Sequence, residues 1–183
     1  RRNEHLPIFR LPSEILACIF AINRTTPRIE EFGAEHLRWI AVTHVCRRWR
    51  QVALDFPDLW TRGCFKHGLN WTKEMFARSK TAPLYLEVTW SRTAKENGAL
   101  IKAHMFHIRT LTLRTAISDT EFLAQPAPIL ESFVLKDSEI PLCLFANQAP
   151  RLHSAKLVDC TFSWSCLLLL RNLVHVSIIN TTH

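Results

Sequence analysis

Glycine is scarce in this sequence, which has only Gly33, Gly63, Gly68 and Gly98 among its 183 residues. None of the four lies in a glycine-rich loop of the type that cradles phosphate groups. Long apolar runs are also missing. Even the eight apolar residues Ile15–Ile22 are far fewer than the roughly 18–20 residues that a membrane-spanning helix needs. The sequence therefore predicts neither a phosphate-binding loop nor a helix that crosses a membrane.

The cysteines follow no recognisable pattern. No two have C-x-x-C spacing, and Cys18 and Cys46 lie in apolar segments with helical periodicity. We therefore expect buried free thiols in a reducing compartment rather than disulfides. His104 and His107 are three residues apart, but no second ligand pair follows at a zinc-like spacing. No metal site and no cofactor are predicted. The six cysteines are Cys18, Cys46, Cys64, Cys143, Cys160 and Cys166.

Motifs for catalysis are missing as well. Serine, histidine and aspartate occur, but the sequence shows no strained nucleophile turn, ordered triad or acid–base pair of carboxylates. We therefore do not expect an enzyme, and no catalytic residue is proposed.

The chain is basic, with a net charge of +7 and a pI of about 9.4, so nucleic acid has to be considered as a partner. The densest basic cluster, Arg47, Arg48 and Arg50, alternates with apolar residues at helical spacing. That pattern predicts a solvated helix face beside a buried stripe. No aromatic platform, zinc knuckle or recognition helix accompanies the basic residues. We therefore expect a general preference for acidic partners rather than specific binding of nucleic acid.

Two apolar segments near the N-terminus, Leu11–Phe20 and Val42–Trp60, predict short helices. Pro12 suits the first turn of a helix, and Glu14 places a negative charge near the positive end of the helix dipole. With a third segment around Leu37–Val45, three helices fall within roughly fifty residues, which is too few for a stable domain. They carry more apolar surface than they can bury themselves, so a partner is expected to cover it. The apolar stripe of the first helix is formed by Ile15, Leu16, Ile19 and Phe20.

These segments resemble the F-box family, whose pattern is Leu-Pro-x-Glu, an apolar stripe ending in Ile-Phe, Val-Cys-x-x-Trp and a closing Leu-Trp. The pattern is filled here by Leu11, Pro12, Glu14, Ile15, Leu16, Ile19, Phe20, Val45, Cys46, Trp49, Leu59 and Trp60. The F-box docks onto the Skp adaptor of cullin–RING ubiquitin ligases, so the resemblance implies this adaptor as partner and, through it, a cullin. It also implies that the residues facing or bracing the adaptor are Leu11, Pro12, Ile15, Leu16, Ile19, Val45, Cys46 and Trp49. One departure is the connection from Asn23 to Glu35, which is longer than the family's usual tight turn.

A repeat occupies the second half of the chain. Units with the pattern L-x-x-L-x-L start at Ile108, Leu130, Leu152 and Leu173, which are 22, 22 and 21 residues apart. This spacing falls within the roughly 20–29-residue period of leucine-rich repeats. Fourteen and fifteen positions after the first three starts come the apolar pairs Phe122 and Leu123, Leu144 and Phe145, and Cys166 and Leu167. The remaining strand positions of the pattern are Leu111 and Leu113, Phe133 and Leu135, Ala155 and Leu157, and Val176 and Ile178.

Each unit predicts one short strand and one helix or helical turn, and stacked units would build a parallel sheet with helices on one side. Cys160 takes the Asn/Cys place of the leucine-rich pattern, where a small polar group can meet free backbone groups at a turn. The alternative is a set of βα units in a doubly wound sheet. Equal spacing favours the repeat, and we expect it to continue beyond His183.

We therefore expect an α/β (α+β overall) protein in three parts: an F-box helical domain at 1–62, a linker helix at 63–82 and a leucine-rich-repeat-like domain at 83–183. The function hypothesis is a substrate-recognition subunit of a cullin–RING (SCF-type) ubiquitin ligase, located in the cytoplasm, the nucleus or both. The alternative is a protein-binding repeat scaffold whose F-box-like helices only cap the solenoid. Polar residues that end the predicted strands would contact the target protein: Thr115, Asp137, Asp159 and Asn180.

Overall fold

The computed structural model describes residues 7–25, 35–65, 68–88, 94–114, 120–165 and 171–180. The chain divides into two compact units, Arg1–Trp60 and Thr61–His183. In the described ranges, no helix combines the length and the apolar character that crossing a membrane would require. Most of the long connection between Asn23 and Glu35 lies outside the described residues.

The first unit is helical, as predicted, and its second helix has 3₁₀ geometry. Its elements are η1 (Pro7–Arg10), α1 (Ser13–Thr25), η2 (Glu35–His44), α2 (Arg47–Asp55) and η3 (Pro57–Trp60). Pro12 directly precedes α1, and its carbonyl oxygen accepts the first helical hydrogen bond from the Leu16 N–H at 3.1 Å. The missing N–H of Pro12 costs nothing there, because the first amides of a helix have no partner within it.

Aromatic side chains form much of the core of this unit. The rings of Trp39 and Trp60 meet edge to face with centroids 4.9 Å apart, and Phe20 of α1 packs on Trp49 of α2 at 5.2 Å. The buried indole Nε1–H of Trp60 donates to the Ala53 carbonyl at 2.9 Å. Such rings bury large areas and prefer these tilted arrangements, so a few of them can hold a small helical unit together.

Two of the three clustered arginines bind the backbone, and one of them, Arg48, departs from the expectation of a solvated face. Arg48 is half-buried, and its guanidinium donates to the carbonyl oxygens of Phe9 and Leu11. Arg50 donates through Nε to the Thr43 carbonyl at 2.9 Å. These side chains therefore connect α2 to the segments that precede α1 and α2, while Arg47 and Arg50 are exposed, as expected for a solvated face.

The second unit is built on one parallel sheet, which confirms the predicted sheet. Its strands are β1 (Arg62–Cys64), β2 (Leu84–Val88), β3 (Ile108–Leu113), β4 (Ser132–Lys136), β5 (Ser154–Val158) and β6 (His175–Ile179). They pair in the order β1-β2-β3-β4-β5-β6, and every pairing is parallel. Spatial order therefore follows chain order, whereas the strand order of a doubly wound sheet reverses at a switch point.

The segment expected to link the two parts belongs to the sheet unit. Strand β1 was not predicted, because Arg62–Cys64 has no apolar alternation; its pairing with β2 defines it as a strand. Helix α3 (Leu69–Ser79) lies within the segment expected to be a linker helix, 63–82, and its Met75 and Phe76 are buried. The sheet thus begins well before the expected boundary at residue 83.

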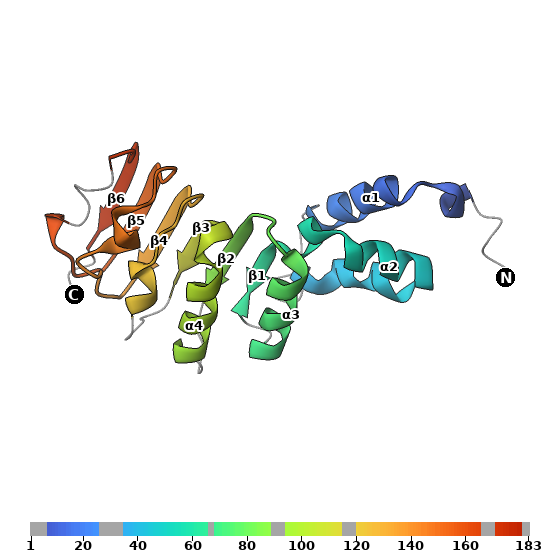
Figure 1. Ribbon diagram of the computed structural model, residues 1–183, viewed down its shortest axis with the longest axis horizontal. Helices are drawn as coiled ribbons and strands as arrows, with labels where there is room; N and C mark the ends of the chain where they lie inside the picture. Colours follow the sequence, from blue (N-terminus) through green and yellow to red (C-terminus); the bar gives the residue numbers. More distant parts are fainter. Residues whose placement is uncertain are drawn as a thin grey trace. The chain divides into compact units, whose positions relative to one another are not determined.

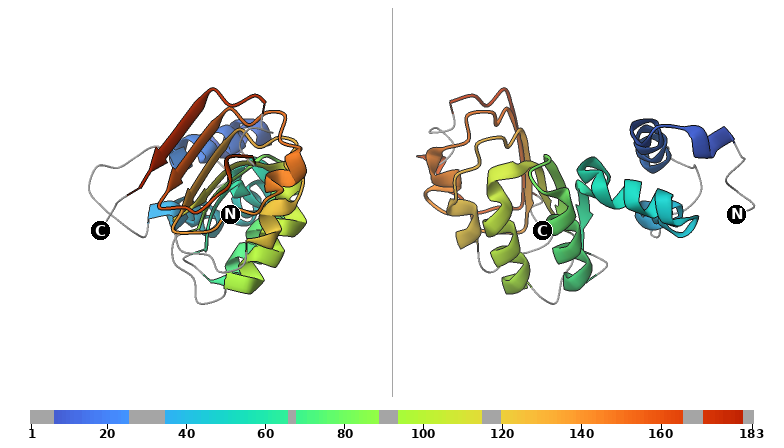
Figure 2. Two further views of the ribbon diagram at one scale, coloured as in Figure 1. Left: turned by 90° about the vertical axis from the view of Figure 1, so that its left-hand side faces the viewer. Right: turned by 45° about the vertical axis from the view of Figure 1, so that its right-hand side comes forward.

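Helical elements cover one face of the sheet, as Figure 1 and Figure 2 show. After α3 they are α4 (Ala94–His104), η5 (Met105–His107), η6 (Glu121–Ala124) and η7 (Leu144–Asn147). Their buried pairs Phe122 and Leu123, and Leu144 and Phe145, lie at the predicted repeat positions. Phe106 lies in η5, after the end of α4, and is exposed.

Rows of apolar side chains cross the sheet in register. Leu111, Phe133 and Ala155 are direct neighbours on β3, β4 and β5, and all three are buried. The row continues to Val176 on β6, which is exposed, contrary to the expectation that it packs like its counterparts. In the described part of the chain β6 is an edge strand, so its inward residues have a neighbouring strand on one side only.

Candidate functional site

The strands end in polar residues at one edge of the sheet. Asp137 directly follows β4 and Asp159 directly follows β5, with φ values of 51° and 52° in the left-handed region. Aspartate tolerates this conformation better than most residues. Asn180 follows β6 and is exposed, whereas Thr115 lies outside the described residues. Because parallel strands end at the same edge, the structure brings Asp137, Asp159 and Asn180 to successive positions there.

Asp137 and Asp159 also continue the backbone ladder. The Asp137 N–H donates to the Val158 carbonyl at 2.9 Å, and the Asp159 N–H donates to the Ile179 carbonyl at 2.8 Å. The Asp137 carboxylate lies 3.5 Å from the Lys136 ammonium group. With the backbone held in this way, the strand-end side chains occupy defined positions rather than positions on a loose loop.

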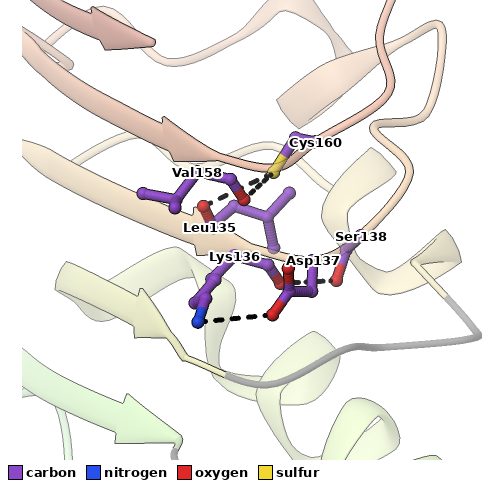
Figure 3. A network of polar contacts seen from close by, with 6 residues as sticks. All are labelled: Leu135, Lys136, Asp137, Ser138, Val158 and Cys160. Carbon is purple, nitrogen blue, oxygen red and sulfur yellow. Dashed lines mark hydrogen bonds and ion pairs between the residues drawn. The ribbon is translucent and has the colours of Figure 1, made fainter. Parts of the chain in front are cut away.

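Cys160 directly follows Asp159 in the sequence, and its thiol lies beside the backbone of Leu135 and Val158 (Figure 3). Its buried thiol donates to the carbonyl oxygens of Leu135 at 3.4 Å and Val158 at 3.3 Å. Burial raises the pKa of this thiol, and the negative charges of Asp137 and Asp159 raise it further. The thiol is therefore protonated and unreactive, and it satisfies backbone acceptors of two neighbouring strands, the role expected for the Asn/Cys place.

The two histidines noted in the sequence form a hydrogen-bonded pair. His107 is buried, and its Nδ1 lies 3.0 Å from the Ala82 carbonyl oxygen, which can only accept, so this nitrogen carries hydrogen. His107 Nε2 therefore accepts from His104 Nδ1 at 2.9 Å. The His104 ring stacks on Phe76 with centroids 4.5 Å apart. Burial lowers the pKa of both imidazoles. Among the described residues, no group of three or more His, Cys, Asp or Glu side chains is placed to hold a metal ion.

Helix α1 has two apolar faces. Leu16 and Phe20 point into the core of the first unit and are buried. Ile15, Ile19 and Ile22 are 47%, 39% and 65% exposed, and their spacing of four and three residues aligns them along one side of the helix. We call these three residues the outer stripe. Three exposed isoleucines on one helix face are unusual for a surface that only contacts water.

Residues near the start of α2 pack against the inner side of α1. Cys46 precedes α2 as its N-cap, and its sulfur accepts from the Trp49 N–H at 3.5 Å. Trp49 is half-buried against Phe20, and its buried Nε1 has no hydrogen-bond partner in the described part of the chain. Val45, immediately before the cap, is exposed. The turn into α2 therefore exposes one aliphatic residue, Val45, and partly buries Cys46 and Trp49.

Residues 8–66, which include α1, η2, α2 and η3 of this helical unit, match the family model described as F-box-like. They form an F-box-like domain. Such a domain suggests an adaptor-binding role in SCF-type ligases, and F-box-like domains typically bind Skp-type adaptors. No curated protein and no solved structure matches the chain. The family match thus covers about the first third of the chain and ends within the segment that follows β1.

Within the F-box-like domain, the residues expected at the adaptor fall into three groups. Pro12, Ile15, Ile19 and Val45 are exposed, and Leu11, Cys46 and Trp49 are half-buried. Leu16 is fully buried, so it does not face outward as part of the stripe; it can only brace the helix from the core. Sequence reasoning missed Ile22, although its position seven residues after Ile15 signalled that it lies on the same face.

Of the four cysteines whose side chains the structure describes, one, Cys160, fits the expectation of buried thiols. Cys18, Cys46, Cys143 and Cys160 are free, but Cys18 and Cys143 are exposed and Cys46 is half-buried. Cys18 lies on α1 beside the outer stripe, and Cys143 lies in the turn before η7. A periodic apolar pattern does not specify burial when a helix has apolar residues on both faces, which explains the error for Cys18.

Proposed function

We propose that this protein is a substrate-recognition subunit of an SCF-type ubiquitin ligase. In this proposal the F-box-like domain binds the Skp adaptor, and the sheet unit binds a target protein. The chain itself performs no chemistry; it holds the target near the ligase, which supplies catalysis. Its place of action would be the cytoplasm, the nucleus or both, where the ligase acts. The observation that carries the proposal is the exposed outer stripe of α1 within a segment that matches the F-box-like family.

The energetics of the outer stripe are compatible with this role. Fully covering an exposed aliphatic side chain contributes roughly 1.5–3 kcal/mol. Ile15, Ile19, Ile22 and Val45 are already partly covered, so together they offset only part of an association cost of roughly 4–15 kcal/mol. The half-buried Leu11 and the exposed Pro12 lie at the start of the same helix and would extend the contact. The adaptor would therefore cover the start of α1 as well as its outer side.

We propose that the sheet unit, which would bind the target, is a leucine-rich-repeat-like solenoid. Its support is the 21–22-residue period of the unit starts, the chain-ordered parallel strands and the helical elements on one face. A solenoid of this kind offers its uncovered strand face and strand ends to a partner. The target would then contact Asp137, Asp159 and Asn180, which the parallel strands place along one edge, together with Thr115.

The adaptor-binding part can be tested with recombinant Skp adaptor and the full chain. We expect the wild-type chain to bind, and the double variant Ile15→Asp/Ile19→Asp to lose binding by a factor of about ten or more, because two charges would enter an apolar interface. Aspartate at position 15 lies in the first turn of α1, where a negative charge is compatible with the helix. Isothermal titration calorimetry measures the affinities.

A matched control comes from the sheet unit. Ile179 is 39% exposed, as is Ile19, but it lies on β6; Ile179→Asp should leave adaptor affinity unchanged. If the wild-type chain does not bind the adaptor, or if the double variant binds equally well, the ligase proposal fails. The alternative of a scaffold with helices that only cap the repeats would then stand.

A further inference from the structure

The turns that follow β4 and β5 run side by side beyond the ends of the strands. Glu139 and Thr161 form a parallel bridge, and the Ile140 N–H donates to the Thr161 carbonyl at 3.0 Å. Three residues beyond the bridged pair, Leu142 and Trp164 occupy equivalent positions of the two turns. They are 72% and 63% exposed. The ring of Phe162 packs edge to face against Trp164 with centroids 5.2 Å apart, which holds the indole in a defined orientation.

The same turns are acidic, although the chain as a whole is basic. Residues 136–147 and 159–165 contain the carboxylates of Asp137, Glu139 and Asp159 and one cation, Lys136, which gives a formal net charge of −2 against +7 for the whole chain. Asp137 and Asp159 both act on the thiol of Cys160 between them. Both turns therefore contribute carboxylates near Cys160. We call Asp137, Glu139, Leu142, Asp159 and Trp164 the strand-end surface.

We propose that the strand-end surface binds a protein segment in which a large apolar side chain is flanked by lysine or arginine. This inference rests on the proposed function and names the class of target. An exposed tryptophan and an exposed leucine at equivalent positions of the two turns supply the apolar anchor, since tryptophan is among the residues that most often dominate binding energy at protein interfaces. The carboxylates select a basic partner and repel nucleic acid and anionic lipid surfaces, which would otherwise also accept an exposed tryptophan.

Three fluorescein-labelled twelve-residue peptide pools provide the probes for fluorescence anisotropy with the full chain. The first pool has a central Trp or Leu flanked by Lys and Arg, the second replaces the basic residues by Asp and Glu, and the third replaces the apolar residue by Ser. We expect binding of the first pool only, weakening as salt is raised, because exposed charges are screened. Tighter binding of the acidic pool, equal binding of the serine pool or no binding of any pool overturns the inference.

Substitutions in the strand-end surface test whether the peptides bind there. Leu142→Ser and Trp164→Ser should each weaken binding of the first pool about tenfold, and Asp137→Asn/Glu139→Gln should reduce both its affinity and its salt dependence. Val174 is the matched control, because it is 72% exposed like Leu142 but precedes β6, at the opposite ends of the strands. If Val174→Ser weakens binding as much as Leu142→Ser, the inference fails.

Adaptor affinity measured on the same preparations separates this inference from the proposed function. All these variants should bind the Skp adaptor like the wild-type chain, and circular dichroism should show an unchanged fold. Loss of peptide binding by a wild-type chain that still binds the adaptor would overturn only the strand-end assignment. Failure of adaptor binding with retained selectivity for the first peptide pool would overturn the ligase proposal and leave the basic target segment in place.

Discussion

Ser138 and Cys160 occupy the same place in neighbouring turns of the sheet unit. They lie 22 residues apart, and each donates to the carbonyl oxygen two residues earlier: Ser138 Oγ to Lys136 at 3.0 Å, and Cys160 Sγ to Val158 at 3.3 Å. Cys160 also reaches back to the Leu135 carbonyl of the preceding strand at 3.4 Å. A small side chain with a hydrogen to donate is therefore the common requirement at this position. The Cys160 thiol adds a hydrogen bond to the neighbouring strand β4.

Replacement of Cys160 tests that requirement. Cys160→Ala leaves the carbonyl oxygens of Val158 and Leu135 without this donor, and we expect the free energy of unfolding to fall by about 0.5–1.5 kcal/mol. Cys160→Ser keeps a donor of the kind that Ser138 provides and should cost less. Urea unfolding measures both, with the exposed Cys143→Ala as control. Equal losses for alanine and serine would show that the hydrogen bonds at this position contribute nothing.

The pair formed by His104 and His107 predicts a loss of stability in acid. Burial lowers the pKa of both side chains below the ordinary value of 6.5. As the pH falls below that value, the unfolded chain takes up protons before the folded one, so stability is complete above about pH 6.5 and declines as the pH drops through the lowered values. His107→Gln removes one titrating group and retains a donor for Ala82.

The measurement is the free energy of unfolding in urea at a series of pH values from about 5 to 8. Stability of the wild-type chain should fall more steeply below pH 6.5 than that of His107→Gln. At pH 8 both histidines are neutral, so the difference between the two proteins there reports only the packing change. Parallel curves over the whole range would mean that the pair is not protonated differently in the folded and unfolded states.

Much of the sheet was predictable because burial repeats along the chain. The inward positions of β3, β4 and β5 recur every 22 residues, and the structure buries Leu111, Phe133 and Ala155 in one row. Strand β1 was not predictable in the same way. Its three residues carry no apolar alternation, and their conformation depends on pairing with β2, which lies more than twenty residues further along the chain. Local patterns do not encode such long-range pairing.

The candidate adaptor site was predictable only in part. Periodicity placed Ile15 and Ile19 on α1, but it did not separate them from Leu16, which is buried on the other apolar face. Which side faces the core depends on where η2 and α2 pack. The role of Arg48 was missed for a similar reason, since its partners are backbone carbonyl oxygens and any residue type could provide them.

Arg48 should therefore be important for the stability of the F-box-like domain. Arg48→Ala removes two charge-assisted hydrogen bonds to the carbonyls of Phe9 and Leu11, and we expect a loss of about 1.5–3 kcal/mol in the free energy of unfolding. Arg47 is the matched control, because it is the adjacent residue, has the same side chain and is exposed. Arg47→Ala should change stability by less than about 0.5 kcal/mol. Equal effects of the two variants in urea unfolding would contradict the bracing role.

Cys18 provides a chemical probe of the outer stripe without any substitution. It is an exposed free thiol on α1, next to Ile19, so an adaptor that covers the stripe should also shield it. Cys143 is likewise exposed but lies before η7 in the sheet unit and serves as an internal reference. We expect N-ethylmaleimide to alkylate both in the isolated chain, and saturating Skp adaptor to slow Cys18 at least tenfold while Cys143 reacts as before. Cys160, buried and with a raised pKa, should react only on unfolding. Mass spectrometry of peptides from a time course gives each rate. Unchanged reactivity of Cys18 at an adaptor concentration that saturates binding would place the adaptor elsewhere on the domain.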